Sequence, residues 1–303
     1  MTQDRVIALG FFDGVHRGHA ALLTKARQTA DRLGCRAAVL TFSNHPDELV
    51  FGCKTPLINS LEDRRELMTR KFGIQEVVSI PFDRALMQTP WEEFVDKLLV
   101  EQLHAVHVVC GHDFTFGNRG EGTPQRLKEK CTRLGIGCDV IEKVVCHHVT
   151  VSSTYIRQLL QKGVVAEAIA LLGHRHFFTG TVVPGKRLGR SLGIPTANLR
   201  LPDGILAPAF GVYAAEVLLE DGRRFPAVTN VGVCPTVEQD TGVTVEPWLL
   251  DFDGDLYGQT IRVEFCQFLR PERKFGTLEE LRREILRNAQ QTRDYFDQTQ
   301  AAR

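Results

Sequence analysis

The chain has 303 residues, of which 43% are hydrophobic and 24% are charged, a composition typical of a globular protein with about two domains. Lysine plus arginine and aspartate plus glutamate each number 37, so the formal net charge is zero. This balance excludes the strong positive field of a general nucleic-acid binder, and no apolar run approaches the roughly 20 residues that cross a bilayer. We therefore expect no nucleic acid and no membrane as a partner.

Eight cysteines lie at positions 35, 53, 110, 131, 138, 146, 234 and 266. They contain no C-x-x-C pair, and the first 30 residues show no secretory signal. Their spacing matches no structural zinc pattern either. Reduced thiols in a cytoplasmic protein are the expected arrangement.

Up to residue 173, strand-like and helix-like segments alternate. Apolar runs predict strands at residues 6–11, 37–42, 77–81, 105–110 and 137–141. Helical periodicity lies between them, at residues 20–33, 61–72, 91–103 and 124–134, and a helical tail follows at 154–172. This alternation predicts an α/β domain in which helices cover both faces of a parallel sheet.

After residue 174, short β-rich runs dominate. They lie at residues 177–183, 212–219, 225–231, 243–252 and 261–268. Turn signals such as Asp221-Gly222 and Asp253-Gly254 separate them, which predicts a small antiparallel β-barrel. One amphipathic helix, from residue 278 to about 296, ends the chain. The predicted domains are residues 1–173 and 174–303.

The stretch GFFDGVHRGH, residues 10–19, follows the first predicted strand and opens the first helix. Ligands of parallel α/β sheets bind beyond the carboxyl ends of strands, where helix N-termini present free N–H groups. Gly14 and Gly18 would let a phosphate approach the backbone closely. His16 and His19 would donate hydrogen bonds to its oxygens during phosphoryl or nucleotidyl transfer. The alternative is a loop with two surface histidines.

The stretch VSSTYIRQLL, residues 151–160, is a second candidate anion site. Ser152, Ser153 and Thr154 are helix N-cap residues in the simplest interpretation. Three successive hydroxyls exceed that need, and Arg157 follows one helical turn later. Hydroxyls and a guanidinium around a helix N-terminus would form a second clamp for an anion.

The stretch GTVVPGKR, residues 180–187, resembles the phosphate-binding loop G-x-x-x-x-G-K. It has Arg187 where that loop needs a hydroxyl for magnesium, and it opens no helix, so we reject a true P-loop. Further on, Thr196 and Asn198 in GIPTANL would face the same side of an extended chain, and their oxygens suit Mg²⁺. An ordinary turn after the proline is the alternative.

Glu246 lies in TVEPWLLDF, where apolar neighbours predict a mostly buried strand. A carboxylate in such a place is either paired or functional. The acidic stretch DFDGDLYG that follows lacks the later glutamate of a calcium loop, so we expect turns there.

Together these motifs resemble one family, the bacterial bifunctional riboflavin kinases/FAD synthetases. The first half carries the likeness in GFFDGVHRGH, TFSNHP, GHDFTFGNRGEG and SSTYIRQLL. The second half carries it in GTVVPGKRLGRSLGIPTANL, GVYAAEV, TNVGVCPT, VEPWLLDFDGDLYGQTIRVEF and LRPERKFGTLEELRREI. The blocks run in order along essentially the whole chain. The resemblance implies a nucleotidyltransferase-like (Rossmann-like) domain followed by a riboflavin kinase barrel.

By this resemblance, the first domain would join AMP from ATP to FMN and release pyrophosphate. The groups that hold the ATP phosphates would be His16, His19, Ser153, Thr154 and Arg157. The ATP or flavin region would be lined by Gly14, Asp113 and Asn44 or His45.

The second domain, by the same resemblance, would phosphorylate riboflavin with ATP. Glu246 would act as general base on the 5′-hydroxyl of the ribityl chain, a role that needs hydrogen-bond reach. Thr196 and Asn198 would contact Mg²⁺ and the ATP phosphates, and Arg293 on the last helix would border the flavin. A glycine-rich flap over the nucleotide, residues 185–193, would contribute Gly185, Lys186 and Arg190.

Two positions depart from the family pattern. His176 stands where the family often has tyrosine, and Pro247-Trp248 follows Glu246 where a less rigid pair is expected. A proline there would tilt the carboxylate or mark a barrel edge. Two other functions stay open: a riboflavin kinase without adenylylation, and a protein that binds flavin or RNA without chemistry. The intact polar motifs argue against both, and the zero net charge argues against RNA.

Overall fold

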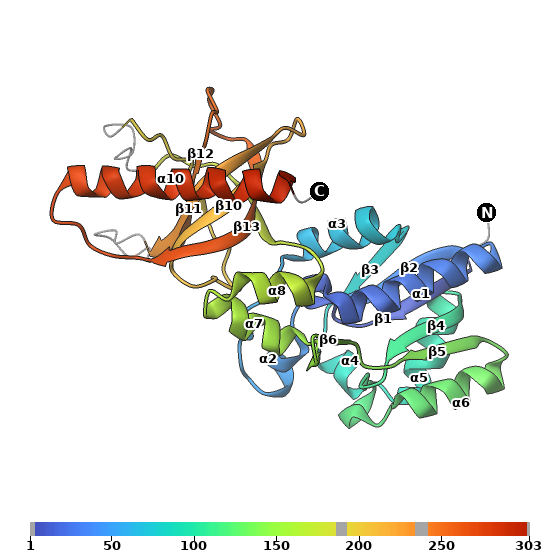
Figure 1. Ribbon diagram of the computed structural model, residues 1–303. Helices are drawn as coiled ribbons and strands as arrows, with labels where there is room; N and C mark the ends of the chain where they lie inside the picture. Colours follow the sequence, from blue (N-terminus) through green and yellow to red (C-terminus); the bar gives the residue numbers. More distant parts are fainter. Residues whose placement is uncertain (1–3, 186–192, 234–241, 302–303) are drawn as a thin grey trace. The chain divides into compact units, whose positions relative to one another are not determined.

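A computed structural model describes residues 4–185, 193–233 and 242–301 (Figure 1). The chain forms two compact units, Met1–Ser153 and Thr154–Arg303. The sequence-based boundary at residue 173 differs from this division, because the helical tail packs with the barrel. As a boundary between two functions, residue 173 stays a prediction.

The first unit is built on a five-stranded sheet in the order β3-β2-β1-β4-β5, with parallel neighbours throughout. Its strands are β1 (Arg5–Leu9), β2 (Arg36–Phe42), β3 (Glu76–Ile80), β4 (Ala105–Gly111) and β5 (Gly137–Ile141). The central strand reads RVIAL without polar alternation, because helices bury both of its faces. All five strands lie close to their predicted positions.

Two helical layers cover this sheet. The helical elements are η1 (Asp13–Val15), α1 (Arg17–Leu33), α2 (Pro46–Val50), α3 (Leu61–Phe72), α4 (Arg84–Gln88), α5 (Trp91–Glu93), the π-helix η2 (Phe94–Gln102), η3 (Asn118–Gly120) and α6 (Pro124–Leu134). Leu23 of α1 and Met68 of α3 pack on one face, while Leu99 of η2 and Leu127 of α6 pack on the other. The hairpin β6 (Val145–Cys146) and β7 (Val149–Thr150) precedes the second unit.

The second unit is an antiparallel sheet in the order β8-β13-β10-β11-β12-β9. Its strands are β8 (His176–Thr181), β9 (Leu199–Arg200), β10 (Gly211–Leu218), β11 (Arg224–Val233), β12 (Val243–Leu249) and β13 (Thr260–Pro271). Beyond β8, the Val183 N–H donates to the Asn198 oxygen at 2.8 Å, so the two edges of the sheet nearly meet. Tyr213, Val245 and Phe265 lie in the apolar core that this curved sheet encloses.

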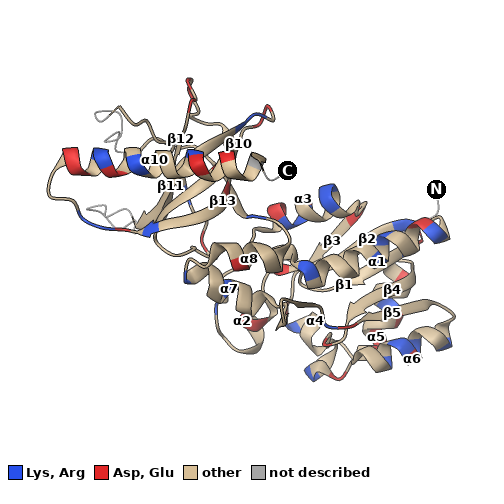
Figure 2. Ribbon diagram, in the orientation of Figure 1, with Lys and Arg blue, Asp and Glu red and all other residues tan. Residues whose placement is uncertain are grey.

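Among the described residues of the second unit, three helices accompany the barrel: α7 (Ser153–Gln161), α8 (Val165–Leu172) and α10 (Leu278–Ala301). Val165 of α8 joins the barrel core, whereas Ala289 of α10 packs on the outer face of the sheet. Both signs of charge alternate along α10, as expected of a solvated helix face (Figure 2). Within the described ranges, every helix is too short or too polar to cross a membrane.

The predicted fold class is confirmed: an α/β parallel-sheet domain is followed by a small antiparallel barrel with a C-terminal helix. The segment 91–103 differs in detail, because it is one turn of α-helix that continues as a π-helix. The two tryptophans of the chain fall one in each unit, Trp91 at the start of α5 and Trp248 on β12.

Candidate active sites

The loop between β1 and α1 has an uncommon backbone. Phe12 and Val15 have φ angles of 58° and 40°, and Gly14 between them has 77°. Positive φ in a β-branched residue is an outlier, and such strain is often found at functional sites, where neighbouring contacts enforce it. Here the buried Asp13 carboxylate accepts the Ile58 N–H at 2.9 Å. The loop is therefore held in one shape beyond the carboxyl end of the central strand.

His16 and His19 stack at the start of α1, with ring centroids 3.6 Å apart and planes 11° from parallel. The His16 Nδ1 accepts the His19 backbone N–H at 3.2 Å and caps the helix, so a neutral His16 carries its proton on Nε2. Burial, and then the charges of His16 and Arg64, hold the pKa of His19 well below its usual value. A neutral His19 is better suited to donate a hydrogen bond to a phosphate oxygen than to form an ion pair with it.

Gly18 has a role within the protein itself, and its predicted contact with a phosphate stays a prediction. A Cβ at this position would lie 3.0 Å from Cε1 of the His16 ring. The glycine therefore makes room for the imidazole itself, whereas Gly14 has the positive φ that the sharp loop requires.

The hydroxyl-rich motif begins beside the same loop. The Ser153 hydroxyl donates to the Asp13 backbone oxygen at 2.9 Å, which ties the start of α7 to the histidine loop. Thr154 is exposed and Arg157 is half-buried, and both belong to the second unit. The closure of Thr154 and Arg157 on the ATP phosphates stays a prediction.

The order of the first sheet reverses between β1 and β4. Ligands of open parallel sheets bind at such a switch point, beyond the carboxyl ends of the strands. The histidine loop follows β1, and Asp113 follows β4 with a side chain that is 82% exposed. The structure therefore places Asp113 and the histidines after the two strands that flank the switch point.

Asn44 and His45 follow the next strand, β2. The Asn44 carboxamide donates to the Phe82 oxygen and accepts the Phe82 N–H, both at 2.9 Å. The His45 Nδ1 accepts the Asp47 N–H at 3.1 Å and caps α2, while its ring meets Phe11 edge-on at 4.6 Å. Both side chains shape this edge of the sheet. Their direct contact with a ligand stays a prediction.

A cavity of about 950 Å³ opens in the first unit, and six of the residues that line it are phenylalanines. The phenylalanines that line it are Phe42, Phe51, Phe82, Phe94, Phe114 and Phe116. Phe114 and Phe116 lie 5.5 Å apart with planes within 21° of parallel. A cavity of this size and lining suits a flat aromatic ligand. The sequence analysis did not identify these phenylalanines as a ligand site.

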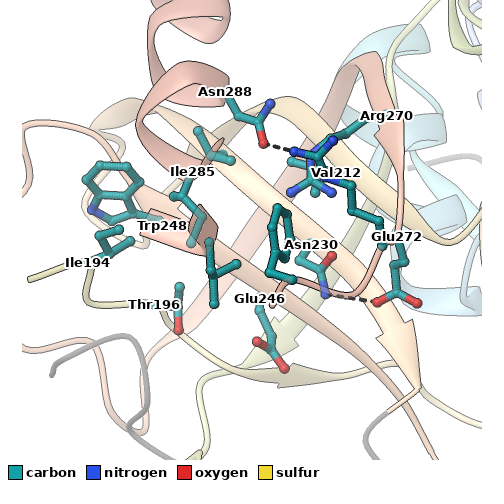
Figure 3. Close-up of a pocket in the computed structure, with 14 residues that line it drawn as sticks. Ile194, Thr196, Val212, Asn230, Glu246, Trp248, Arg270, Glu272, Ile285 and Asn288 are labelled. Atoms are coloured by element: carbon teal, nitrogen blue, oxygen red, sulfur yellow. Dashed lines mark hydrogen bonds between the residues drawn. The ribbon is translucent and has the colours of Figure 1, made fainter. Parts of the chain in front are cut away.

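The second unit contains a cavity of about 350 Å³ (Figure 3). Its apolar lining consists of Ile194, Val212, Val228, Trp248, Phe275, Leu281 and Ile285. Its polar lining consists of Thr196, Asn230, Glu246, Arg270, Glu272, Arg273 and Asn288. An apolar pocket with a few convergent polar groups is the usual form of a small-molecule site.

Strand β12 brings Glu246 and Trp248 to this cavity. Residues 245, 247 and 249 are buried in the barrel, so the residues between them face the opposite side. Glu246 is half-buried rather than mostly buried, because its apolar neighbours alternate with it instead of surrounding it. The Thr244 hydroxyl donates to Glu246 Oε1 at 3.1 Å. This contact steadies the carboxylate in the cavity.

Pro247 lies where the pairing between strands β9 and β12 ends. The short strand β9 pairs with β12 only at Thr244 and Val245. Beyond them, the Pro247 oxygen still accepts the Ala197 N–H at 2.9 Å, but a proline has no N–H to return. The proline therefore stands where β9 leaves β12.

Thr196 and Asn198 lie on the extended segment that leads into β9. Both side chains are half-buried, and the Asn198 amide donates to the Thr196 backbone oxygen at 3.4 Å. Figure 3 shows the Thr196 hydroxyl and the Glu246 carboxylate on the same side of the cavity. A Cβ on Gly185 would lie 2.4 Å from Cγ of Asn198, so the Gly185 backbone closes over the carboxamide. Hydroxyl, carboxamide and carboxylate oxygens are ligands that magnesium takes, so these residues fit that ion.

The remaining predicted ligand residues of this unit are Lys186, Arg190 and Arg293. Lys186 and Arg190 lie outside the described residues. The Arg293 guanidinium forms a two-pronged ion pair with Asp251, with one N–O distance of 2.9 Å. Among the described residues of α10, the cavity is lined by earlier turns, up to Asn288.

Sequence reasoning missed Asn230, Arg270 and Asn288. Asn230 stands directly opposite Glu246 in the β11–β12 ladder, and its amide donates to Glu272 at 3.4 Å. The Arg270 Nε donates to the Asn288 carboxamide at 3.0 Å, which ties β13 to α10 across the cavity wall (Figure 3). Only the strand register reveals the first contact, and only the docking of α10 reveals the second.

Comparisons with known proteins cover both units. A family model described as FAD synthetase matches residues 1–155, and one described as riboflavin kinase matches residues 172–296. A bifunctional riboflavin kinase/FMN adenylyltransferase of Listeria monocytogenes is 35% identical over 295 residues, which are 97% of this chain and 93% of the relative. The protein of the same name from Escherichia coli K12 is 35% identical over 300 residues, with 98% and 94% covered.

One solved structure matches nearly the whole chain. A crystal structure titled as a macrolide-efflux protein from Streptococcus pneumoniae has a TM-score of 0.85 at 29% identity, and the match covers 97% of this chain and 95% of that one. The macrolide efflux named in that title refers to the Streptococcus pneumoniae protein. The match supports the two-part fold described above.

Fold and sites together define an ATP-using transferase with a nucleotidyltransferase unit and a kinase barrel. The family follows directly from the relatives. This chain belongs to the bifunctional riboflavin kinase/FMN adenylyltransferase family, as its sequence motifs indicated. The predicted family and enzyme class are confirmed, and the non-enzymatic alternative loses its support.

Proposed function

We propose that this protein phosphorylates riboflavin with ATP in the barrel unit and then joins AMP from a second ATP to the FMN in the first unit. The observation that carries the proposal is the setting of Glu246. Its carboxylate lies in a cavity that has an apolar wall and that also contains the hydroxyl of Thr196. Riboflavin has a flat apolar ring and a polar ribityl chain, so it matches a cavity with an apolar wall and nearby oxygen groups.

In the kinase reaction, Glu246 takes the proton of the riboflavin 5′-hydroxyl as its oxygen attacks the γ-phosphorus of ATP. The isoalloxazine ring packs on the wall that includes Trp248. Thr196 and Asn198 would hold Mg²⁺ with the ATP phosphates, and the ion would supply positive charge that offsets the negative charge on the transferred group. Gly185, Lys186 and Arg190 provide further contacts to the nucleotide, and Arg293 on α10 borders the flavin.

In the adenylylation reaction, an FMN phosphate oxygen attacks the α-phosphorus of ATP and pyrophosphate leaves. His16 and His19 donate N–H groups to the phosphate oxygens, and this matters most as negative charge builds up. The other contacts to ATP come from Gly14, Asp113, Ser153, Thr154 and Arg157. The phenylalanine-lined cavity holds the isoalloxazine ring, with Asn44 and His45 fixing its edge.

The test is to incubate the protein with riboflavin, ATP and Mg²⁺ and to resolve FMN and FAD by chromatography. We expect both products, and we expect a chelator to stop both reactions. An Asn198→Ala variant should need more Mg²⁺ to form FMN but not to form FAD from supplied FMN. If FMN accumulates and no FAD appears with FMN and ATP in excess, the protein is a kinase alone.

We also infer that these reactions take place in the cytoplasm. The cysteines show no pattern of an exported, disulfide-bonded protein. The partners in this proposal are riboflavin, FMN and ATP, with no nucleic acid and no membrane.

A further inference from the structure

Two neighbouring rows of the β11–β12 ladder divide the barrel cavity into an apolar and a polar part. Val228 and Trp248 form one cross-strand pair on the cavity face, and Asn230 and Glu246 form the next pair along. Successive pairs on one face of a sheet lie about 7 Å apart, twice the rise of one strand residue. A ring on the apolar row can therefore extend a five-carbon polyol chain to the polar row.

Asn230 is the cross-strand neighbour of the proposed base. Both side chains are half-buried and line the cavity. Residues directly opposite each other in an antiparallel pair have Cβ atoms about 4.5–5.5 Å apart. A group that reaches Glu246 from the cavity thus also passes Asn230. The kinase reaction proposed above gives Asn230 no role.

A contact with Glu272 determines how the Asn230 carboxamide is oriented. The Asn230 Nδ2 donates to Glu272 Oε1 at 3.4 Å (Figure 3). An ionised carboxylate only accepts hydrogen bonds, so the amide nitrogen faces Glu272 and the amide oxygen faces elsewhere. The oxygen is an acceptor, so the ligand group that it suits is a donor such as a hydroxyl.

Gly232 allows Glu272 to reach this position. It lies two residues after Asn230 on the same face of β11, and a Cβ there would lie 2.1 Å from Glu272 Oε1. Because Gly232 has no side chain, the Glu272 carboxylate lies against β11 beside the amide. Glu272 directly follows β13, so two strands and a glycine together orient Asn230.

We propose that Asn230 determines the specificity of the kinase for a terminal diol. Its amide oxygen accepts a hydrogen bond from the ribityl 4′-hydroxyl, while Glu246 takes the proton of the 5′-hydroxyl. This inference rests on the kinase function proposed above. Two acceptors at one level of the ladder match two donors on neighbouring carbons. The contact with the 4′-hydroxyl holds the end of the chain, so the 5′-oxygen stays within reach of Glu246.

The test compares riboflavin with an analogue that lacks only the 4′-hydroxyl, using the full-length protein with ATP and Mg²⁺. The kcat/KM for the analogue should be at least about tenfold lower, because Asn230 is left without its donor. Asn230→Leu keeps the volume of the side chain but has no acceptor. The two flavins should then differ in kcat/KM by less than about twofold. Asn230→Ala removes the same oxygen without apolar bulk and should give the same ratio, and melting curves show which variants are folded.

Thr229→Val is the matched control. Thr229 precedes Asn230 on β11, but it is fully buried on the opposite face of the strand. Among the described residues, its hydroxyl has no hydrogen-bond partner, and valine has nearly the same shape. Thr229→Val should therefore keep the preference for riboflavin over the analogue.

The outcomes separate this inference from the function on which it rests. A preference that persists in a folded Asn230 variant would overturn the role of Asn230, and so would a parent protein that phosphorylates both flavins equally well. In both cases the kinase function stands. A parent protein that forms no FMN from riboflavin would overturn the proposed function and the specificity for a diol together.

Discussion

Among single residues, Glu246 is the first to test, because it is the proposed general base of the kinase reaction. Glu246→Gln keeps the size of the side chain and its bond with Thr244 but removes the proton acceptor. Kinase turnover should fall on the order of 10²- to 10⁴-fold, the usual contribution of a positioned general base. ATP affinity, the thermal midpoint and FAD formation from supplied FMN should change little. Turnover, ATP titration and a melting curve on the one variant check this.

Glu272 provides the matched control, because it is a second carboxylate in the same cavity and also accepts a hydrogen bond. Glu272→Gln should cost much less turnover. A Glu246→Gln rate within about threefold of the parent would remove Glu246 from the mechanism. A lower melting temperature with weaker ATP binding would instead indicate a structural carboxylate.

His19 is the corresponding test in the first unit. His19→Ala removes a ring that stacks on His16 and would donate to the ATP phosphates. FAD formation should fall by roughly 10²-fold or more, the scale of losing one transition-state donor, while FMN formation stays nearly intact. The two products are assayed separately, with exposed His148→Ala as the control. Equal loss of both activities in a folded variant would contradict two separate sites.

Single residues were predictable where their function depends on their place in the chain. A strand followed by a helix indicated where His16 and His19 would lie, whereas the shared face of Thr196 and Asn198 stays a prediction. Residues that act through distant contacts escaped the sequence. Asn44 bonds the backbone of a segment near residue 82, and Arg293 pairs with Asp251. Local pattern carries no information on either partner.

At the scale of elements, Arg64 joins α3 to the carboxyl ends of two strands. The side chain is fully buried and donates to the Phe11 oxygen after β1 and, at 3.4 Å, to the Phe42 oxygen at the end of β2. Arg64→Met should lower the free energy of unfolding by about 1–3 kcal/mol, because both carbonyls lose this donor, although the Phe11 oxygen keeps the Thr41 hydroxyl. Urea denaturation measures the change. Arg65→Met, an exposed neighbour on the same helix, should have almost no effect, and equal effects would show that the buried contacts contribute little.

Elements were predicted best where a regular period extends over enough residues. The helices 61–72 and 124–134 and the strand 137–141 match their predicted bounds. Periodicity could not distinguish a π-helix from an α-helix at 94–102, because both bury a stripe of apolar residues. The two-residue strand β9 is too short to carry any pattern. The packing of α8 on the barrel depends on tertiary contacts that the sequence does not display.

For the whole molecule, His176 predicts how stability depends on pH. Its ring is buried against Phe265, and burial lowers its pKa to about 3 from 6.5. Below pH 6.5 the unfolded chain therefore binds a proton that the folded protein does not, and stability falls as the pH falls toward 3. This residue alone should cost about 2 kcal/mol between pH 6.5 and pH 5, at about 1.4 kcal/mol per pKa unit.

His176→Phe tests this expectation, because a phenyl ring can stack on Phe265 without titrating. Unfolding free energies of the variant and the parent are compared at pH 7 and pH 5. The variant should lose less stability on acidification than the parent does. An identical loss of unfolding free energy in both proteins would show that His176 does not contribute to the fall in stability at low pH.

The division into two units predicts that the kinase works alone. A fragment of residues 174–303 contains the barrel and α10, so it should convert riboflavin to FMN. A fragment of residues 154–303 should do the same with a higher melting temperature, because Val165 of α8 is only 3% exposed and lies in the barrel core. Product chromatography and thermal melts of both fragments check this. If only the full chain forms FMN, the barrel depends on the first unit.

The separate tryptophans give each half of the molecule its own optical signal. Trp248 lines the barrel cavity. Trp91 belongs to the first unit and packs closely on Gly117, because a Cβ added at Gly117 would lie 2.6 Å from the Trp91 Cα. Indole emission overlaps flavin absorption, so a flavin that enters the barrel quenches the nearer indole more strongly. Trp91→Phe and Trp248→Phe each leave a single emitter, and stopped-flow traces of the two proteins would time the departure of FMN from one site against its arrival at the other.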